Sequence, residues 1–582
     1  MKPLPTASGI TIKHATFKTL PEALDYAAQG ATGFSFFGPR GKLLAVLPYR
    51  QLREEALILA RKLASLSFPR GTTIAILAHT HPFFVKLFFA CQYAGYVPVP
   101  LPLMLQLSSS EAYVAQLVRL LKISRARAFF TPPEFLKFAR DAAEKAGVEI
   151  SGAEEDLVSL PEKGVDLTPL QEDELAYIQF TSGSTRFPRG VMVTQRALMH
   201  NLHLISKFGV CRREGDRAVS WLPFYHDMGL VGLVLAPLAS QVSVDFFSPK
   251  DFIMRPGFWL KLISEHRATI SFSPPFGYEL ATLRLKEEDL EGLDLSSWRV
   301  AGVGAEMIRP SVLEKFARKF APCGFNPKAF LPCYGMAECT LAISFTPLGK
   351  GARVDAVERE PLAKEGKVIF SEPSSEAKLL VRCGKPLPGL EIEIRDERGN
   401  SLPEKRVGLL FVRGESIMAG YLGDPETTEE VLKEGWLNTG DLAYLNEGEI
   451  VITGRAKDMI IVHGKNIWPQ DIEALAESLP EVRAGNACAF PVPDEEGRDV
   501  PVVVVQTKAL SSTKERELKA HIASLVRKEL GIDCQVVLVP RNTIVRTTSG
   551  KPARSHTRRI CQEKGYLPFY FSSKEKARVS AS

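Results

Sequence analysis

Short apolar runs alternate along the chain with segments whose apolar residues recur at helical spacing. The runs at residues 73–78 and 96–100 are typical of buried strands. Residues 49–66 carry apolar side chains every three or four positions, as one face of a helix requires, and residues 82–93 are also expected to form a helix. Strands that alternate with helices favour a parallel sheet with helical crossovers. The pattern therefore predicts an α/β protein.

A second, smaller series of elements lies near the C-terminus. Helices are expected over residues 469–478 and 512–530, and strands over 485–490, 500–507 and 535–539. The chain has 582 residues, which is more than one hydrophobic core usually holds, so we expect at least two domains.

Two segments between these two series of elements carry polar residues that bear on where the segments lie in the fold. The expected helix at residues 195–208 carries His200, Asn201 and His203, which we expect at its surface or capping neighbouring segments rather than on a metal. Residues 350–378 alternate acids and bases with few aromatic residues, which is typical of an exposed loop or hairpin.

Composition excludes several classes of protein. The content of 45% hydrophobic and 24% charged residues is that of an ordinary globular protein, and a net charge of +6 is too small to indicate nucleic-acid binding. Nine cysteines without a C-x-x-C pair indicate neither zinc nor a disulfide framework, and they fit a reducing, cytoplasmic compartment. The longest apolar run, residues 228–239, is too short to span a bilayer and contains Pro237.

Residues 177–194, YIQFTSGSTRFPRGVMVT, predict two strands joined by a small, hydroxyl-rich turn. Glycine lets a backbone approach a ligand closely, and hydroxyl and N–H groups bind phosphate oxygens. Arg186 and Arg189 add positive charge, so a polyphosphate suits this turn. An ordinary hairpin loop rich in turn residues is the alternative. No Gly-Lys-Ser/Thr follows, so the turn is not a Walker motif.

Two further stretches carry candidate chemistry. The pair His226 and Asp227 raises the possibility of a hydrolase, but the sequence has no G-x-S-x-G to supply a nucleophile. The stretch LPCYGMAECTL at residues 331–341 places Tyr334, which can stack on a base, near the carboxylate of Glu338. A lone carboxylate beside phosphates suits Mg²⁺, which keeps waters and phosphate oxygens as its other ligands.

The motif TSGST-R-x-P-x-GV resembles the phosphate loop of the adenylate-forming enzymes, which include acyl-CoA synthetases, peptide-synthetase adenylation domains and luciferase. Arg186 and Arg189 stand where most members have glycine and lysine, and in this the chain is similar to the fatty acyl-AMP ligases. Further matches follow in the family's order: WLPFYHDMGL, YGMAE, GKPLPG, WLNTGD, GRAKD and TTSGK.

The resemblance implies an adenylate-forming, acyl-CoA synthetase-like α/β fold. A large N-terminal domain of αβ subdomains would span residues 1–455 and contain an insertion near residues 350–378. A small C-terminal α/β domain, residues 456–582, would act as a mobile cap, with Lys457 at the hinge.

The resemblance also implies roles for individual residues. Lys551, Glu338 and His226 would be catalytic, and Glu338 would also hold Mg²⁺. The acyl pocket would be formed by Trp221, Phe224, Asp227, Met228 and Gly229. ATP and the adenylate would be bound by Thr181, Ser182, Gly183, Ser184, Thr185, Gly304, Ala305, Glu306, Tyr334, Gly335, Met336, Ala337, Asp441 and Arg455.

The implied reaction is attack of a fatty-acid carboxylate on the α-phosphorus of ATP, giving acyl-AMP and pyrophosphate. The acyl group would then pass to the phosphopantetheine arm of an acyl-carrier protein. The alternatives are an acyl-CoA synthetase of the same fold, a non-catalytic adenylate-binding protein, and the hydrolase named above. Neither a nucleic-acid partner nor a membrane span is expected.

Overall fold

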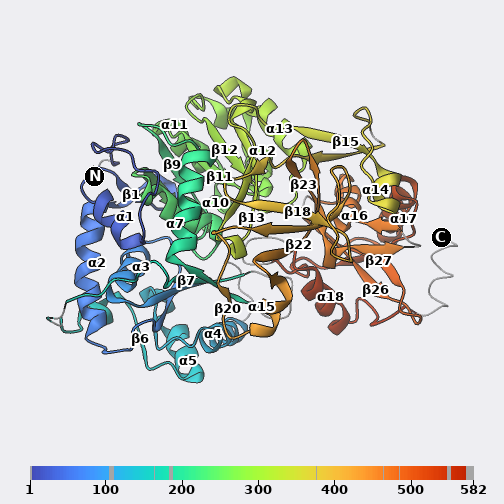
Figure 1. Cartoon of the computed structure of the whole chain (residues 1–582). Coiled ribbons are helices and arrows are strands. Elements are labelled where there is room, and N and C mark those ends of the chain that lie inside the picture. Colours follow the sequence, from blue (N-terminus) through green and yellow to red (C-terminus); the bar gives the residue numbers. More distant parts are fainter. Residues whose placement is uncertain are drawn as a thin grey trace.

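The computed structural model describes residues 3–103, 110–162, 164, 166–181, 188–374, 376–462, 465–483, 485–546 and 552–571. In the view of Figure 1 the chain runs from its N-terminal helices on the left to a separate group of helices and strands on the right. Within the described ranges, no helix combines the length and the apolar character that crossing a bilayer demands.

A nine-stranded sheet forms the centre of the large domain, in the order β17-β14-β13-β12-β11-β9-β10-β1-β2. Strands β9 to β13 and β1 run parallel, so their carboxyl ends share one edge, where ligands of α/β sheets commonly bind. The strands are β1 (Gly33–Phe37), β2 (Leu43–Pro48), β9 (Arg217–Ser220), β10 (Ser243–Phe247), β11 (Ile270–Ser273), β12 (Val300–Val303), β13 (Phe330–Gly335), β14 (Ala342–Phe345) and β17 (Lys385–Pro386).

The predicted alternation near the N-terminus produces a second, parallel sheet in the order β4-β3-β5-β6. Its helices have apolar faces that close the core on both sides, as the spacing predicts. The strands are β3 (Thr73–Leu77), β4 (Val97–Leu101), β5 (Ala128–Phe130) and β6 (Ile150–Gly152). The helices of this part are α1 (Leu20–Ala27), α2 (Tyr49–Ala64), α3 (Pro82–Ala94), α4 (Ser110–Ser124), α5 (Leu136–Ala146) and α6 (Glu154–Val158).

The two strands predicted around the hydroxyl-rich turn are present. Strand β7 (Leu175–Phe180) pairs antiparallel with β8 (Gly190–Thr194), and β20 (Gly420–Tyr421) adds to the other edge of β8. Residues 182–187 lie outside the described residues. The order β20-β8-β7 brings residue 421 beside the strand that leaves the turn.

The helix predicted over residues 195–208 is α7 (Gln195–Leu204), followed by a π-helical turn, η3 (Ile205–Gly209). Of the two expected positions, at the surface or capping a neighbouring segment, the surface position is wrong for Asn201. Asn201 is buried, and its amide bonds the backbone N–H and carbonyl of Ala342 because α7 lies against β14. His200 and His203 are part-buried and bond Ser416 and the His14 carbonyl.

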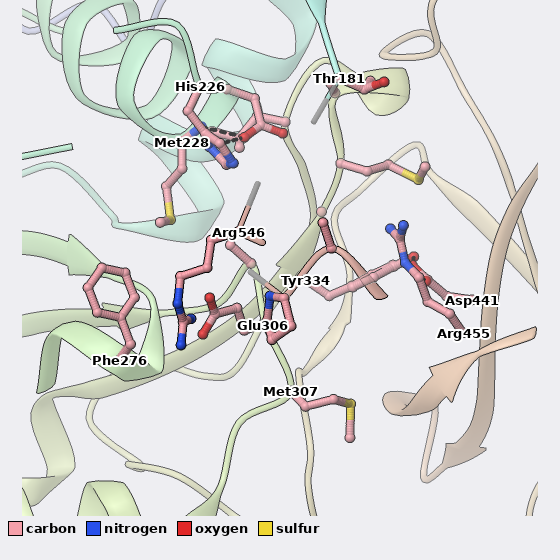
Figure 2. A pocket seen from close by; sticks show the side chains of 18 of the residues that line it. Thr181, His226, Met228, Phe276, Glu306, Met307, Tyr334, Asp441, Arg455 and Arg546 are labelled. Atoms are coloured by element: carbon pink, nitrogen blue, oxygen red, sulfur yellow. Dashed lines mark hydrogen bonds and ion pairs between the residues drawn. The ribbon is translucent and has the colours of Figure 1, made fainter. Parts of the chain in front are cut away.

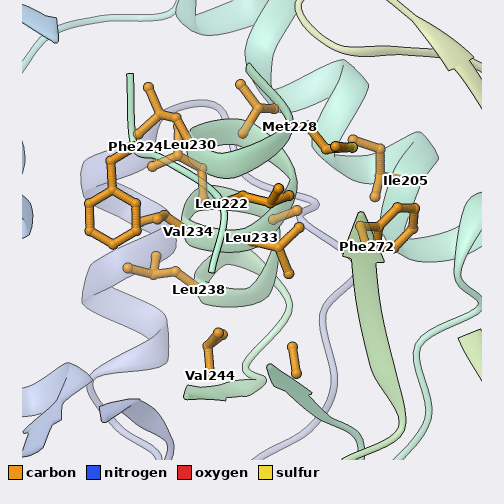
Figure 3. Packing of buried hydrophobic residues seen from close by; sticks show 14 of the residues in the cluster. Ile205, Leu222, Phe224, Met228, Leu230, Leu233, Val234, Leu238, Val244 and Phe272 are labelled. Carbon is orange, nitrogen blue, oxygen red and sulfur yellow. The ribbon is translucent and has the colours of Figure 1, made fainter. Parts of the chain in front are cut away.

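The apolar run at residues 228–239 folds into two short helices around a second π-helical turn, η4 (Val231–Leu235). Figure 3 shows Leu230, Leu233 and Val234 of this stretch packed among other buried apolar side chains. The flanking helices are α8 (Asp227–Leu230) and α9 (Ala236–Ala239). Because the run is buried on all sides, its uniform hydrophobicity reflects a core position.

The remainder of the large domain frames the carboxyl edge of the central sheet. A further sheet has the order β18-β19-β22-β21, with β23 on β22. Its strands are β18 (Glu391–Arg395), β19 (Gly408–Arg413), β21 (Leu432–Lys433), β22 (Trp436–Asn446) and β23 (Glu449–Arg455). The helices here are α10 (Pro249–Met254), α11 (Gly257–Glu265), α12 (Pro275–Arg284), α13 (Pro310–Phe320) and α15 (Pro425–Val431).

Beyond β23 the chain forms the smaller unit that the C-terminal pattern predicts. Two apolar clusters of its own lie on either face of the sheet β26-β27-β28. The strands are β24 (Ile460–Val462), β25 (Lys465–Ile467), β26 (Ala487–Pro493), β27 (Asp499–Gln506) and β28 (Gln535–Val539). The helices are α16 (Pro469–Glu477), α17 (Ser512–Leu530) and α18 (Arg554–Glu563).

An exposed loop or an exposed hairpin was expected at residues 350–378. The structure has a hairpin there, but part of the hairpin is buried. Strands β15 (Val354–Glu358) and β16 (Ala377–Val381) are antiparallel and enclose helix α14 (Arg359–Glu365). Val357, Leu362 and Leu380 are buried with Tyr444 of β22 and Trp468 of the small domain. The hairpin therefore contacts both domains.

Candidate active site

A cavity of about 2680 Å³ lies between the large and small domains. Its wall includes residues from β11, from the segment that follows β12, from the carboxyl end of β13, from β22 and β23, and from α16 and α18 of the small domain. Figure 2 labels Thr181, His226 and Tyr334 among the residues that line it. One space thus receives most of the residues that the sequence singled out.

Asp441, Tyr334 and Arg455 form a hydrogen-bonded group on one side of the cavity. The Tyr334 hydroxyl donates to Oδ2 of Asp441 at 2.6 Å, and Nε of Arg455 lies 3.0 Å from Oδ1. Burial and the Asp441 carboxylate raise the pKa of Tyr334, so this phenol stays a neutral donor. The antiparallel pairing of β22 with β23 sets Asp441 opposite Arg455. The carboxylate is therefore held in one orientation toward the cavity.

Glu338 lies on the short turn that follows β13. Its Oε1 accepts a hydrogen bond of 2.8 Å from the Tyr421 hydroxyl, and burial raises the pKa of its carboxyl group. The backbone can make this turn because Gly335 is glycine: a Cβ there would lie 1.8 Å from the Leu341 carbonyl oxygen. Met336 and Ala337 line the cavity beside it.

Among the described residues, no group of three or more His, Cys, Asp or Glu side chains is placed to hold a metal ion. Glu338 is a single carboxylate at the cavity wall, a donor set that suits a cation whose other ligands are water and phosphate oxygens.

His226 and Asp227 lie at the start of α8 and line the cavity. His226 Nδ1 is 2.7 Å from Asp227 Oδ1, the same oxygen that accepts the Met228 backbone N–H at 2.7 Å. Dashed lines at His226 in Figure 2 mark where its ring makes this contact. The ring is thus anchored through Nδ1, which leaves Nε2 as its second hydrogen-bonding atom.

Of the five residues predicted for the acyl pocket, two line the cavity and three are absent from its lining. Asp227 and Met228 line the cavity. Phe224 is buried against Phe84 and Phe246, and Trp221 stacks on Phe252 with ring centroids 3.8 Å apart. Gly229 permits a tight turn, since a Cβ there would meet the Pro223 carbonyl at 2.1 Å. The apolar wall itself continues through Gly232, Leu233, Phe272 and Phe345.

The segment after β12 also reaches the cavity. Ala305, Glu306 and Met307 line it, and Ala305 has a left-handed φ of 67°. Gly304 packs against Cys333, where a Cβ would approach the carbonyl oxygen and Sγ at 2.8 Å each. Lys457 lines the cavity from the short 3-10 helix that follows β23.

Two predicted groups lie outside the described residues: Ser182–Thr185 and Lys551. Their described neighbours can be placed. Thr181 and Pro188, on either side of residues 182–187, both line the cavity. Arg546 and Pro552, on either side of residues 547–551, pair with each other and also line the cavity.

Tyr421 and Phe276 line the cavity, although the sequence motifs assign neither of them a role. Nothing in the segment around Tyr421 indicates that its hydroxyl reaches Glu338, and only the pairing of β20 with β8 shows it. Phe276 lies on α12 with its ring 5.5 Å from that of Trp221. In a sequence Phe276 is one aromatic among many, so no local signal could have identified it.

Comparison with known families gives two matches, which cover separate parts of the chain. Residues 45–422 match the family described as AMP-binding enzyme. Residues 464–559 match the AMP-binding enzyme C-terminal domain.

Individual relatives cover nearly the whole chain. A Caulobacter vibrioides protein, provisionally named an acyl-CoA synthetase, is 43% identical over 555 residues, covering 95% of this chain and 96% of its own. The medium-chain-fatty-acid–[acyl-carrier-protein] ligase JamA of Moorena producens is 32% identical over 575 residues, covering 93% and 95%. A solved structure from studies of fatty acyl-adenylate ligases of E. coli and L. pneumophila is 43% identical, with a TM-score of 0.91 and coverage of 95% and 100%.

Proposed function

We propose that this chain, which belongs to the AMP-binding enzyme family, activates a fatty acid with ATP to give acyl-AMP and pyrophosphate. The observation that supports this most directly is the continuity of the cavity. The same cavity contains the polar group around Asp441 and Glu338 and the apolar wall that begins at Met228. A nucleotide and an alkyl chain can therefore meet in one space.

The nucleotide would occupy the side of the cavity near Asp441. A carboxylate offers two acceptor oxygens, which suits the two hydroxyls of a ribose, and Arg455 and Tyr334 fix its orientation. The phosphates would then extend toward Thr181 and the hydroxyl-rich turn at residues 182–185. Arg189, whose guanidinium lies 5.2 Å from the centre of the Tyr421 ring, adds positive charge on this side.

The fatty-acid carboxylate would lie at His226, with its chain along the apolar wall past Met228. One carboxylate oxygen attacks the α-phosphorus, the bond from that phosphorus to the bridging oxygen breaks, and pyrophosphate leaves. No covalent bond to the protein forms, so positioning and electrostatic stabilisation supply the rate. The mixed anhydride is prone to hydrolysis, and a cavity closed by the small domain protects it.

Glu338 would hold Mg²⁺, and the ion would supply charge neutralisation at the phosphate oxygens when bound. The donor set supports this: Glu338 is a single carboxylate at the cavity wall, oriented by Tyr421. Lys551 would bring a second positive charge from the small domain to the α-phosphate. Its described neighbours Arg546 and Pro552 line the cavity, which supports that role.

The domain boundary and the compartment belong to the same proposal. We place the hinge at Lys457, between β23 of the large domain and β24 of the small one. The small domain, residues 456–582, would close on the cavity for adenylation. All nine cysteines are free, which supports a reducing, cytoplasmic location.

The acceptor of the acyl group would be the phosphopantetheine arm of an acyl-carrier protein. The hairpin at residues 350–378 supports this choice over free CoA, because it packs on both domains and favours one arrangement of them. The Caulobacter relative bears the name of an acyl-CoA synthetase, so that activity is the competing candidate.

Product analysis tests the proposal. The protein is incubated with ATP, Mg²⁺ and fatty acids of several chain lengths, alone, with CoA, or with a holo acyl-carrier protein. Mass spectrometry should find acyl-AMP in every mixture and thioester only with the carrier. Rapid acyl-CoA formation would identify a CoA ligase, and absence of pyrophosphate release with every acid would exclude fatty-acid adenylation.

A further inference from the structure

Three buried polar residues form one part of the cavity wall. Ser206, Arg212 and Ser240 are only 1%, 5% and 4% exposed, yet all three line the cavity. They contact one another: Nε of Arg212 donates to the Ser240 carbonyl at 3.0 Å, and the backbone N–H of Arg212 donates to the Ser206 carbonyl at 2.9 Å. Arginine is rarely buried to this degree, because a charged group out of water is costly.

One side of the helical stretch from α8 to α9 connects this polar group with His226. Met228 and Ser240 stand at its two ends, about 18 Å apart at the rise of a helix, which is the length of a medium to long alkyl chain. The residues on this side recur at helical spacing, and those that line the cavity are Met228, Gly232, Leu233, Ala236, Pro237 and Ser240. The opposite side, with Leu230, Val234 and Leu238, lies toward Phe224 in Figure 3.

Between its two polar ends, this part of the cavity is apolar. Figure 3 shows Met228 and Leu233 on the side of the helical stretch that Ile205 and Phe272 face. The apolar residues that line the cavity across from the stretch are Ile205, Val210, Phe272 and Phe345. An alkyl chain that starts at His226 therefore finds apolar surroundings along its length and a different environment at its far end.

That far end offers hydrogen-bond donors. The Arg212 guanidinium donates through Nε and Nη2 to the carbonyls of Ser240 and Gln241, and through Nη1 to Oε2 of Glu214 at 3.2 Å. These bonds use three of the five N–H groups of a guanidinium. The Glu214 side chain is 52% exposed, so water weakens its pairing with the charge of Arg212.

A plain alkyl end suits this group poorly. A methyl group that reached Arg212 would cover its N–H groups without accepting a hydrogen bond, and a buried donor that lacks an acceptor costs free energy. An oxygen at the same position would accept from the guanidinium, and hydrogen bonds from charged donors are the strong ones. The hydroxyl of Ser206, 3.1 Å from Nδ1 of His14, lies on the same side.

We propose that the acid activated in this cavity carries an oxygen function at the end of its chain, a hydroxyl or a carboxylate, which Arg212 binds. The substrate class is then ω-hydroxy or α,ω-dicarboxylic acids, in preference to plain fatty acids of the same length. One carboxylate reacts beside His226, and Arg212 determines specificity at the other end. This inference rests on the proposed function, since it names the substrate for the same site.

A series of matched acids tests the preference in wild-type protein. Pyrophosphate release is measured with alkanoic, ω-hydroxyalkanoic and dicarboxylic acids over a range of chain lengths. At the length that reaches Arg212, kcat/KM for an ω-oxygenated acid should exceed that for the plain acid by about tenfold or more. Shorter chains should reverse the preference, because their oxygen would lie among apolar side chains. The hydroxyl and carboxylate arms identify which oxygen function is bound.

Arg212→Met removes the donors and should abolish the preference at every length, and Ser206→Ala should reduce it less. Arg212 also bonds two carbonyls at the end of α9, so circular dichroism accompanies the variant. Arg212→Lys, which keeps the charge, should retain part of the preference for the dicarboxylic acid. Arg50→Met, at an arginine that bonds the Ala28 carbonyl and does not line the cavity, is the control.

The outcomes separate the inference from adenylation itself. Pyrophosphate release without any preference for ω-oxygenated acids would overturn the inference and leave the proposed function in place. A preference that persists in folded Arg212→Met would overturn the role of Arg212. Absent release with every acid would overturn the proposed function, and calorimetric binding of the same acids would then decide the inference: tighter binding of the ω-oxygenated acid supports it, and equal binding overturns it.

Discussion

The hydroxyl of Tyr421 donates a 2.8 Å hydrogen bond to Oε1 of Glu338, from a strand 83 residues further along the chain. Strand β20 carries Tyr421 and pairs with β8, which leaves the hydroxyl-rich turn, so three separate motifs meet here. The bond leaves Oε2 of Glu338 for a different partner. Tyr421 is therefore placed to orient the carboxylate that we assign to Mg²⁺.

Tyr421→Phe should raise the Mg²⁺ concentration needed for half-maximal pyrophosphate release by roughly tenfold. A hydrogen bond to a charged group is worth about 1.5–3 kcal/mol, and its loss frees the carboxylate to rotate. Titration of pyrophosphate release with Mg²⁺ measures this shift. Tyr26→Phe, which removes an exposed hydroxyl bonded to the Thr11 carbonyl, is the matched control. An unchanged Mg²⁺ requirement in Tyr421→Phe would remove Tyr421 from the metal site.

Lys551→Ala should lower kcat for acyl-AMP formation by at least about a hundredfold and leave ATP affinity nearly unchanged. A charge delivered by the closing small domain stabilises the transition state more than bound ATP, so its loss appears in kcat. Stopped-flow pyrophosphate release and equilibrium ATP binding separate the two effects. If ATP affinity collapsed while turnover at saturation persisted, Lys551 would be a binding residue only.

Glu477 makes stability depend on pH. It faces Arg309 across the domain interface at 3.5 Å, and burial raises the pKa of its carboxyl group to about 7. The unfolded carboxyl titrates near 4.5, so the folded protein holds the extra proton between these two values. The stabilisation from the protonated form is complete below pH 4.5 and is lost as pH rises through about 7.

Glu477→Gln should flatten that dependence. Its amide oxygen can still accept the Gly485 N–H, as Oε1 of Glu477 does at 2.7 Å, but it carries no charge at high pH. The free energy of unfolding of wild type should fall from pH 5 to pH 8, while that of the variant should not. We therefore expect the stability of the variant relative to wild type to rise by about 1–3 kcal/mol from pH 5 to pH 8, allowing for solvent screening. Urea unfolding at both pH values measures the difference. Parallel pH profiles for the two proteins would show that Glu477 titrates normally.

Elements and site residues are predicted most accurately from the sequence where local signals agree with the tertiary structure. Helix α17 has the predicted bounds because Ser511 caps its first turn and Gly531 ends it in a left-handed conformation. The two paired strands on either side of residues 182–187 follow from their β-forming residues in the same way. Motif order also identified Asp441, Arg455 and Glu338, which the structure brings into one cavity.

Other features depend on residues far away in the sequence. Asparagine is typical of a helix surface, but Asn201 is buried because its amide bonds Ala342 of β14, which lies 141 residues further along the sequence. In the hairpin at residues 350–378 the apolar residues are interspersed with acids and bases, so no apolar pattern is visible. The residues that they pack against, Tyr444 and Trp468, lie much further along the sequence. No local pattern contains such contacts, so neither position could be derived from its own segment.

The hairpin leads to the last prediction, because one of its residues joins the two domains. Lys378 of β16 is 6% exposed, and its Nζ lies 2.8 Å from Asp471 Oδ2 and 3.5 Å from the Trp468 ring centre. Burial lowers the pKa of Lys378, and Asp471 opposes that effect. Deleting the hairpin would expose the cluster around Leu362, so substitution of the buried pair is the sharper test.

Lys378→Met combined with Asp471→Asn should raise the ratio of acyl-CoA to acyl-AMP formed with free CoA by about tenfold or more. The double change removes the link between hairpin and small domain without leaving one charge buried alone, which would cost about 3–5 kcal/mol of stability. Contacts that favour one domain arrangement by a few kcal/mol make the other rare, so their loss should admit the CoA-reactive arrangement. Product analysis measures the ratio, and Lys364→Met, at an exposed pair with Glu360, is the control. The prediction fails if the double variant still rejects CoA while hydrogen exchange shows the small domain released, or if wild type already converts CoA as fast as it forms adenylate.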